Sequence, residues 1–261
     1  MRILVTNDDG ISAPGLVVAE EIAAALAGDG GEVWTVAPAF EQSGVGHCIS
    51  YIRPMRLEKL GERRFAVEGS PADCVLAGVG EIMRDAPPDL ILSGVNRGHN
   101  VAEDTVYSGT IGGAMEGALH GFRSIALSQY YGAPANAPAD PFAAARAHGP
   151  EVIRRLLAAD IWPRTPYAAF HNINFPAVAA EAVRGVRATV QGARPAPTFG
   201  VLPHVAPNGR TFLWLTNATG NAGTAEGSDS RECHDGFVTV TPLSADLTVR
   251  ALLTPLAQAL G

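Results

Sequence analysis

The sequence predicts an α/β protein with a parallel β-sheet, because its first segments alternate between strand-like and helix-like patterns. Residues 2–6 form a short apolar run that ends in the turn sequence TNDDG, as expected of a buried parallel strand. Pro14 starts an Ala-, Leu- and Glu-rich segment that ends near Gly28, which predicts a helix. Residues 33–36 form the next apolar run. The order strand, helix, strand predicts a right-handed βαβ unit, and hence helices covering a parallel sheet.

The alternation continues along the chain. Ser70, Pro71 and Asp73 form a helix start, with Ser70 as the cap, Pro71 in the first position and Asp73 in the reciprocal capping position. We expect this helix to run to about Arg84. The further elements that we expect are a strand at 89–93, a polar loop at 94–108, a helix at 110–119, a strand at 124–128, a surface loop at 132–140, a helix at 142–157 and strands at 167–174 and 186–190.

The character of the sequence changes after residue 192, where Gly, Asn, Thr and Pro become frequent. Strand-like runs occur at 211–215 and 237–241, and a short C-terminal helix is interrupted by Pro255. We therefore divide the chain into a core at 1–192 and a separate β-rich extension at 193–261, within one structural domain.

The composition excludes some classes of protein. Hydrophobic residues make up 47% of the 261 residues and charged residues 17%, which suffices for a sizeable core. The net charge is −7 and no basic block occurs, so a nucleic-acid polymer or an anionic membrane is not the expected partner. A small phosphorylated substrate is compatible with this charge when a metal ion supplies positive charge.

The cysteines and the first residues bear on the cellular compartment. Cys48, Cys74 and Cys233 are far apart and form no C-x-x-C motif, so we interpret them as reduced thiols. The sequence shows neither a signal-peptide pattern nor an apolar run of membrane-spanning length. We expect a cytoplasmic protein.

Polar side chains follow the predicted strands at the edge of the sheet where ligands bind in such folds. They are Asn7, Asp8 and Asp9 after the first strand, Ser43 and Gly44 after the second, and Asn96, His99, Asn100, Ser108, Gly109 and Thr110 after residues 89–93. Two adjacent carboxylates repel each other unless a cation lies between them. Oxygen ligands without His or Cys suit a hard ion, so Asp8 and Asp9 predict a Mg²⁺ or Mn²⁺ site.

The turn Ser108–Gly109–Thr110 opens a predicted helix, whose free N–H groups and positive dipole end suit a phosphate. Gly112 and Gly113 would let backbones approach closely. His99 is a candidate acid or base in the same loop. The histidines show no H-E-x-x-H spacing, and a nucleophile elbow, a P-loop and a G-x-G-x-x-G fingerprint are missing. These absences argue against a zinc site, a serine hydrolase, an ATPase and a dehydrogenase.

The combination of motifs resembles the SurE survival-protein nucleotidases. The segments that carry the resemblance are ILVTNDDGISAPG, EQSGVGHCIS, EGSPADCV, PDLILSGVNRGHN, VYSGTIGGAMEG, NINFP and DGFVTVTPL. They follow the order found in that family and extend from the first residues to Leu243.

The resemblance implies a 5′/3′-nucleotidase with a Rossmann-like core and one divalent metal ion per subunit. By motif position it implies four metal ligands, Asp8, Asp9, Ser43 and Asn96. It also places Asn100, Ser108, Gly109 and Thr110 at the phosphate, and we add Asn7 and Gly44 to this substrate-binding set. Family members form dimers or tetramers through a β-hairpin and a C-terminal segment, which the extension at 193–261 would supply.

Three segments depart from the family pattern. Ala39 and Phe40 stand where a charged Asp-Arg pair is expected, Gly112–Gly113 stands where Ala is more usual, and Ser230 replaces an aromatic residue. These changes leave the base preference and the contacts between subunits open.

The resulting hypothesis is metal-assisted hydrolysis of nucleoside monophosphates, with Asp8 or Asp9 as general base and His99 as proton donor to the leaving oxygen. Three alternatives stay open: a receiver-type regulatory domain, a nucleotide-binding module without catalysis, and a phosphatase whose main substrate is polyphosphate or a sugar phosphate. The receiver domain fits least, because the later strand ends in Ser93-Gly94-Val95-Asn96 rather than in a phosphoacceptor Asp.

Overall fold

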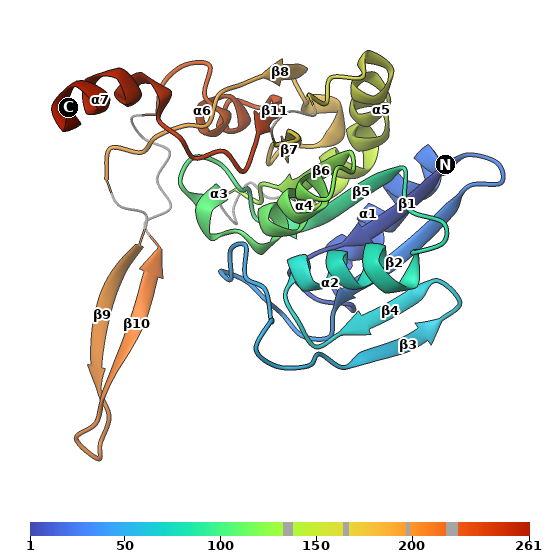
Figure 1. The fold of residues 1–261 in the computed structure, drawn as a ribbon, viewed down its shortest axis with the longest axis horizontal. Coiled ribbons are helices and arrows are strands. Elements are labelled where there is room, and N and C mark those ends of the chain that lie inside the picture. The colour runs from blue at the N-terminus through green and yellow to red at the C-terminus, as the bar shows by residue number, and fades with distance from the viewer. Residues whose placement is uncertain (133–137, 164–166, 197–198, 218–223) are drawn as a thin grey trace.

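A nine-stranded sheet runs through the protein, in the order β3-β4-β2-β1-β5-β6-β7-β11-β8 (Figure 1). The computed structural model describes residues 1–132, 138–163, 167–196, 199–217 and 224–261. β3 is antiparallel to β4 and β11 is antiparallel to β7, whereas the other pairings in this sheet are parallel. The strands are β1 (Arg2–Thr6), β2 (Glu32–Pro38), β3 (Leu57–Gly61), β4 (Arg64–Val67), β5 (Leu90–Arg97), β6 (Ser124–Gln129), β7 (Phe170–Phe175), β8 (Val186–Ala188) and β11 (Val238–Leu243).

Helices cover both faces of this sheet, as the sequence predicts. They are α1 (Pro14–Ala27), α2 (Pro71–Ala77), α3 (Asp104–Tyr107), α4 (Gly109–Leu119), α5 (Ala143–Ala159), α6 (Asp229–His234) and α7 (Leu253–Leu260), with short helical turns η1 (Gly78–Ile82), η3 (Ala180–Ala182) and η4 (Arg250–Leu252). Strand β1 shows why both faces are buried. Ile3 and Val5 pack in the cluster that includes α1 and α5, and Leu4 packs on the opposite side with α2. Successive strand residues point to opposite faces, so an unbroken apolar run requires cover on both sides.

The first βαβ unit and the capped helix form as predicted. Pro14 occupies the first position of α1, and Gly28 ends it with a φ of 71°. At the start of α2, Ser70 Oγ accepts the Asp73 N–H at 3.1 Å, and the Asp73 carboxylate accepts the Ser70 N–H at 2.8 Å. This is the reciprocal capping box that the sequence predicts. The regular helix is shorter than expected, because it changes at Gly78 into the wider turn η1.

Several expectations about the elements are wrong. The expected polar loop at 94–108 is interrupted, because β5 continues to Arg97 and α3 occupies Asp104–Tyr107. Strands β3 and β4, which extend the sheet beyond β2, were not predicted. Pro255 does not interrupt the C-terminal helix, because α7 begins at Leu253 and places the proline in its first turn, where an N–H is not needed. Much of the expected loop at 132–140 lies outside the described residues.

The chain after residue 192 is shared between the large sheet and a hairpin. The predicted strand at 237–241 belongs to the large sheet as β11, where Val238, Thr239, Val240 and Thr241 are buried. This strand therefore joins the sheet that the first part of the chain forms, although it lies after residue 192. By contrast, β9 (Phe199–Val205) and β10 (Thr211–Asn217) form an antiparallel hairpin that projects away from the sheet (Figure 1). No helix among the described residues has the length and apolar content needed to cross a membrane.

Candidate active site

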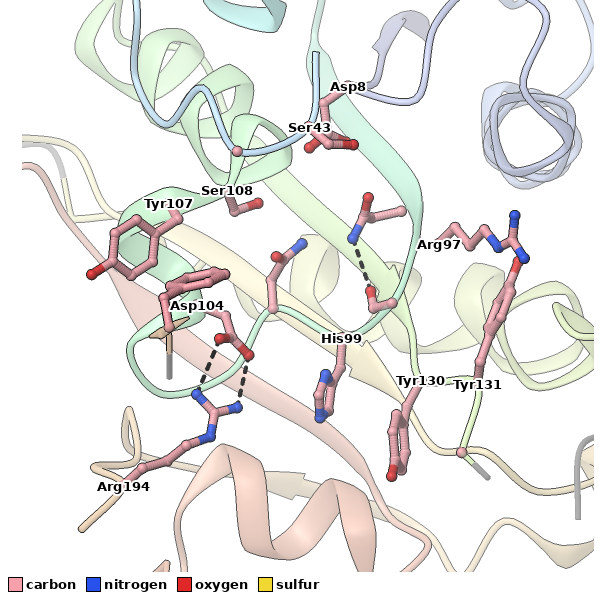
Figure 2. Close-up of a pocket in the computed structure, with 16 residues that line it drawn as sticks. Asp8, Ser43, Arg97, His99, Asp104, Tyr107, Ser108, Tyr130, Tyr131 and Arg194 are labelled. Atoms are coloured by element: carbon pink, nitrogen blue, oxygen red, sulfur yellow. Dashed lines mark hydrogen bonds and ion pairs between the residues drawn. The ribbon is translucent and has the colours of Figure 1, made fainter. Parts of the chain in front are cut away.

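The carboxyl ends of β1, β2 and β5 meet at a pocket of about 580 Å³ (Figure 2). Seven of the predicted site residues line it: Asp8, Ser43, Gly44, Asn96, His99, Asn100 and Ser108. They come from four separate segments of the chain, which the parallel pairing of β1 with β2 and with β5 brings to one edge. The expectation that these loops converge at one edge is therefore confirmed.

Asp8 is buried at the start of α4 and is held there by Thr110. The Thr110 hydroxyl donates to Asp8 Oδ1 at 2.6 Å, and the Thr110 N–H donates to Asp8 Oδ2 at 3.1 Å. A Cβ on Gly109 would lie 2.9 Å from the Asp8 Cβ, so the close approach of α4 to Asp8 requires glycine there. Burial raises the pKa of Asp8 to about 6, the Thr110 hydroxyl opposes this shift, and the neighbouring Asp9 adds to it. Asp8 is thus a buried carboxylate that would be stabilised by a positive charge.

Asp9 lies beside Asp8 but faces a second pocket, of about 670 Å³, that is formed with the start of α1. Arg97 and Tyr131 line both pockets and separate them. Asp9 Oδ2 accepts the Arg97 N–H at 3.0 Å. Burial raises the pKa of Asp9, and the Arg97 hydrogen bond opposes this. Asp9 Oδ2 is therefore engaged by the backbone of β5, whereas Asp9 Oδ1 accepts no hydrogen bond from the described residues.

Ser43 and Asn96 offer two neutral oxygens to the first pocket. The Ser43 hydroxyl donates to Glu41 Oε1 at 2.9 Å, so its lone pairs are available as acceptors. The Asn96 side-chain amide donates to Gly98 O at 2.9 Å, which leaves its carbonyl oxygen without that constraint. Among the described residues, no group of three or more His, Cys, Asp or Glu side chains is arranged to hold a metal ion. A metal site here would combine the two carboxylates with hydroxyl and amide oxygens, a set that suits Mg²⁺ or Mn²⁺.

Asn100 and His99 form the floor of the pocket. Asn100 donates its N–H to Asn174 Oδ1 at 2.7 Å and its side-chain amide to Ser128 Oγ at 2.8 Å. The His99 ring stacks on Tyr130 with centroids 4.4 Å apart. Burial lowers the pKa of His99, so its imidazole is neutral at pH 7.

Three of the predicted substrate-binding residues, Asn7, Gly109 and Thr110, do not line the pocket. Asn7 donates to Gly10 O at 3.0 Å and stabilises the turn after β1. Thr110 directs both of its donors to Asp8, so any influence of Thr110 on a phosphate acts through that carboxylate. The expected close approaches at α4 exist: a Cβ on Gly112 would lie 2.5 Å from Gly46 O, and one on Gly113 would lie 2.8 Å from Ser93 Oγ.

The side walls of the pocket consist of residues that were not predicted. Tyr107 and Phe199 meet edge to face with centroids 5.0 Å apart, and the Arg194 guanidinium binds the Asp104 carboxylate at 2.7 Å (Figure 2). Phe199 is the first residue of β9, so the hairpin contributes to the pocket. A signal for Tyr107 was present, because it precedes Ser108 directly. Nothing in the local sequence connects Arg194 with Asp104, because 90 residues separate them.

Comparison with known proteins agrees with these observations. The family model described as "Survival protein SurE" matches residues 3–197. Two curated relatives, from Ruegeria pomeroyi and Roseobacter denitrificans, are both named "5'-nucleotidase SurE". Each is 58% identical to this chain, and the alignments cover 100% and 98% of both partners, respectively. The crystal structure of the Sure protein from Aquifex aeolicus is similar with a TM-score of 0.83, 32% identity and full coverage of both chains. The protein therefore belongs to the SurE survival-protein family.

Proposed function

We propose that this protein is a 5′-nucleotidase, a phosphomonoesterase that releases phosphate from nucleoside monophosphates with one bound divalent metal ion. The observation that carries the proposal is the convergence of Asp8, Ser43, Asn96 and Ser108 at one pocket. The names of the relatives, which match over the whole chain, support the same activity. The activity on 3′-monophosphates that the resemblance implies belongs to the same proposal.

The metal ligands of this proposal are Asp8, Asp9, Ser43 and Asn96. The buried carboxylate of Asp8 and the available oxygens of Ser43 and Asn96 fit a hard cation. A bound Mg²⁺ or Mn²⁺ would supply positive charge to the phosphate and lower the pKa of water. Thr110 keeps Asp8 oriented toward this site and, as a donor from the start of α4, helps to keep it ionised.

The other pocket residues bind and orient the substrate. Ser108 and Gly44 line the side of the pocket near Asp8 and would contact the phosphate. Of the two candidate bases, Asp9 has the less engaged carboxylate, because one of its oxygens accepts the Arg97 N–H whereas both oxygens of Asp8 receive hydrogen bonds from Thr110. The neutral ring of His99 would donate a hydrogen bond from an N–H to the leaving oxygen rather than act as an imidazolium acid.

The aromatic walls support a nucleoside as the leaving group. The pair Tyr107–Phe199 and the stacked pair His99–Tyr130 border the same pocket as the candidate metal ligands. A pocket of about 580 Å³ is within the range typical of sites for small organic ligands. Flat rings beside a phosphate site suit a purine or pyrimidine base, which binds by stacking on aromatic side chains.

We also propose that the protein is a cytoplasmic homodimer or homotetramer. The hairpin carries exposed apolar side chains on both of its faces, among them Leu202, Leu213 and Trp214. Such surfaces are typical of contacts between subunits. The division of the chain into a catalytic core at 1–192 and an oligomerisation region at 193–261 is part of this proposal.

The test is phosphate release from EDTA-stripped protein with Mg²⁺, Mn²⁺ or no added metal. The substrates are 5′- and 3′-nucleoside monophosphates, polyphosphate, a sugar phosphate and p-nitrophenyl phosphate. We expect metal-dependent release that is fastest with nucleoside monophosphates. Faster release from polyphosphate or sugar phosphate would move the assignment to another phosphatase. Tight nucleotide binding without release, by folded and metal-loaded protein, would favour the non-catalytic binding module.

A further inference from the structure

The loop between β5 and α3 shapes one side of the pocket, because Gly98, His99, Asn100 and Asp104 all line it. One part of this loop is held by strand β7. Asn172 and Asn174 donate from their side chains to Asn100 O at 2.8 Å and 3.1 Å, and Asn174 Oδ1 accepts the Asn100 N–H. The position of Asn100 is therefore fixed within the sheet.

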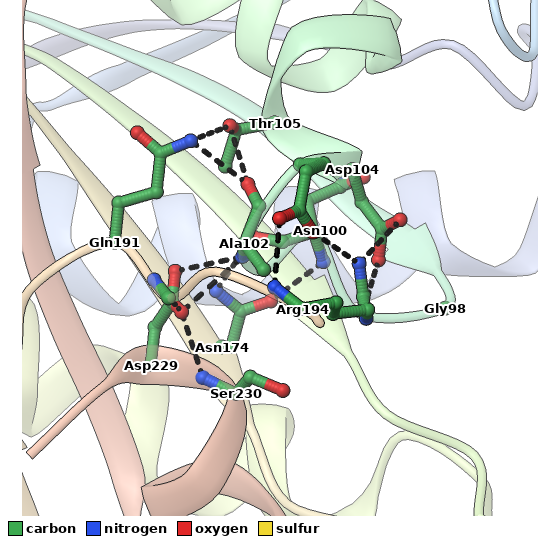
Figure 3. Close-up of polar contacts among 12 residues, drawn as sticks. Gly98, Asn100, Ala102, Asp104, Thr105, Asn174, Gln191, Arg194, Asp229 and Ser230 are labelled. Atoms are coloured by element: carbon green, nitrogen blue, oxygen red, sulfur yellow. Dashed lines mark hydrogen bonds and ion pairs between the residues drawn. The ribbon is translucent and has the colours of Figure 1, made fainter. Parts of the chain in front are cut away.

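The following part of the loop, Ala102, is held by side chains from the C-terminal third of the chain (Figure 3). Both carboxylate oxygens of Asp229, at the start of α6, lie 3.2 Å from the Ala102 N–H. Gln191 donates from its side chain to Ala102 O at 2.9 Å. Ala102 has a φ of 51°, in the left-handed region that a residue with a Cβ rarely adopts. Its conformation thus depends on partners that bind both of its backbone polar groups.

Asp229 itself is fully buried, with an exposed fraction of 0%. Besides Ala102, it accepts the Gly192 N–H at 2.8 Å and its own neighbour's N–H, from Ser230, at 2.7 Å. Burial raises the pKa of Asp229, and these three N–H donors and Arg194 oppose that shift. A buried carboxylate of this kind is costly unless several donors stabilise it. Here the donors are Ala102 in the loop between β5 and α3, Gly192 in the segment that leads into the hairpin, and Ser230 in α6.

We propose that Asp229 is a positioning residue of the active site, whose carboxylate holds Ala102 in its left-handed conformation. It thereby sets the path of the chain from Asn100, which β7 fixes, to Asp104, which lines the pocket. The proposal rests on the proposed phosphatase function of this pocket. Arg194 holds the two residues that follow Ala102, because its guanidinium forms ion pairs with both Glu103 and Asp104. The segment 191–194 and the start of α6 together clamp the loop that the first half of the chain provides.

The main test compares Asp229→Asn with Glu232→Gln. Glu232 is also a buried carboxylate of α6 that accepts a backbone N–H, from Gly227, and it pairs with Arg187, but these partners lie outside the loop. For Asp229→Asn we expect kcat/KM for a nucleoside monophosphate to fall about 10- to 100-fold, mainly in kcat, because catalysis is sensitive to small displacements. The Mn²⁺ concentration for half-activation should not change. Glu232→Gln should keep the wild-type kcat/KM at a temperature where both variants are folded.

The second measurement is amide hydrogen exchange in the peptide that contains residues 98–106. We expect faster exchange in Asp229→Asn than in Glu232→Gln. If Asp229→Asn does not fold, Gln191→Leu provides the test. It removes the Gln191 hydrogen bonds to Ala102 O and to Thr105 Oγ1, leaves the Thr105 hydroxyl as a donor to Ala102 O, and should lower kcat in the same direction but by less.

Two results would overturn the proposal: a wild-type kcat/KM in Asp229→Asn, or equal losses in it and in Glu232→Gln. If the wild-type protein releases no phosphate, the proposed function fails. The exchange comparison then decides alone, and equal exchange in the two variants would overturn the positioning role.

Discussion

The carboxyl edge of the large sheet buries polar side chains, whereas the β9–β10 hairpin exposes apolar ones. At the sheet edge, Asp8, Asn100 and Asp229 are buried polar groups held by several hydrogen bonds from within the same chain. On the hairpin, Leu215 and Trp214 are apolar groups with exposed fractions of 74% and 65%. A buried polar group must find its partners inside the fold, whereas an exposed apolar surface is stabilised when another surface covers it. In the first region these three groups find hydrogen-bond donors within one chain, and we propose that the second region is completed by a second copy.

The largest effect that we expect is at the sheet edge. Asp8→Asn should reduce metal-dependent phosphate release by about 10²- to 10³-fold, because it removes a charge that we propose binds the metal ion. In EDTA at pH 7 we expect the free energy of unfolding of Asp8→Asn to be no lower than that of the wild type. Burial raises the pKa of Asp8, so its charge lowers stability at pH 7, and a neutral amide avoids this cost. Initial rates with Mn²⁺ and urea unfolding in EDTA measure both effects. Asp29→Asn, at an exposed turn, is the control, and near-wild-type activity of Asp8→Asn would contradict the site.

The second effect is on assembly. Leu202 and Trp214 lie opposite each other in the hairpin, so replacing both with Lys places two charges on one face. We expect the oligomer to dissociate to monomers, as measured by light scattering after size exclusion, while each folded chain keeps most of its phosphate release. The same double change at Leu57 and Leu60, which are exposed on β3, should leave the assembly intact. Oligomers that survive the hairpin change would remove the hairpin from the interface.

A smaller effect is expected on stability at two glycines that differ in the space around them. Gly112→Ala should lower the free energy of unfolding by about 1–3 kcal/mol, because the new methyl group meets Gly46 O. Gly80→Ala, in η1, meets no atom within 4 Å and should be neutral or stabilising by up to about 1 kcal/mol. Chemical denaturation measures both variants. Equal stabilities would mean that α4 does not pack against the Gly46 turn as described.

The smallest effect is a pH dependence at the pocket floor. Burial lowers the pKa of His99 in the folded protein, so between the unfolded and folded pKa values the unfolded state binds more protons. The contribution of His99 to stability is present above the unfolded pKa of about 6.5 and decreases as the pH falls through this window. His99→Gln should therefore flatten the decline of unfolding free energy between pH 7 and pH 5. His204→Gln, on the exposed hairpin, serves as the control, and an unchanged slope in His99→Gln would contradict the assignment.

The parts of the site that could be predicted are those encoded by short segments. TNDDG after an apolar run places Asp8 and Asp9 at a strand end, and SGT places Ser108 at the cap of a helix, where its Oγ accepts the Ile111 N–H. Parallel pairing then brings such strand ends together without further information. What each group binds could not be predicted in the same way. Thr110 fits a phosphate contact from sequence, yet the close approach of the start of α4 to the turn after β1 directs its donors to Asp8.

The βαβ order, the capping box of α2, the family and the residues of the strand-end motifs follow from the sequence alone. Each depends on neighbours a few positions apart or on a motif that is contiguous in the chain. Three features required the folded structure: the strand at 237–241 joins the large sheet, Asp9 faces a second pocket, and Asp229 and Arg194 hold the loop between β5 and α3. The contacts of this loop with Arg194 and with Asp229 join residues that are 90 and 127 positions apart, and no local pattern specifies such partners. They arise because a buried carboxylate or strand edge must be satisfied by whichever donors the completed fold brings near.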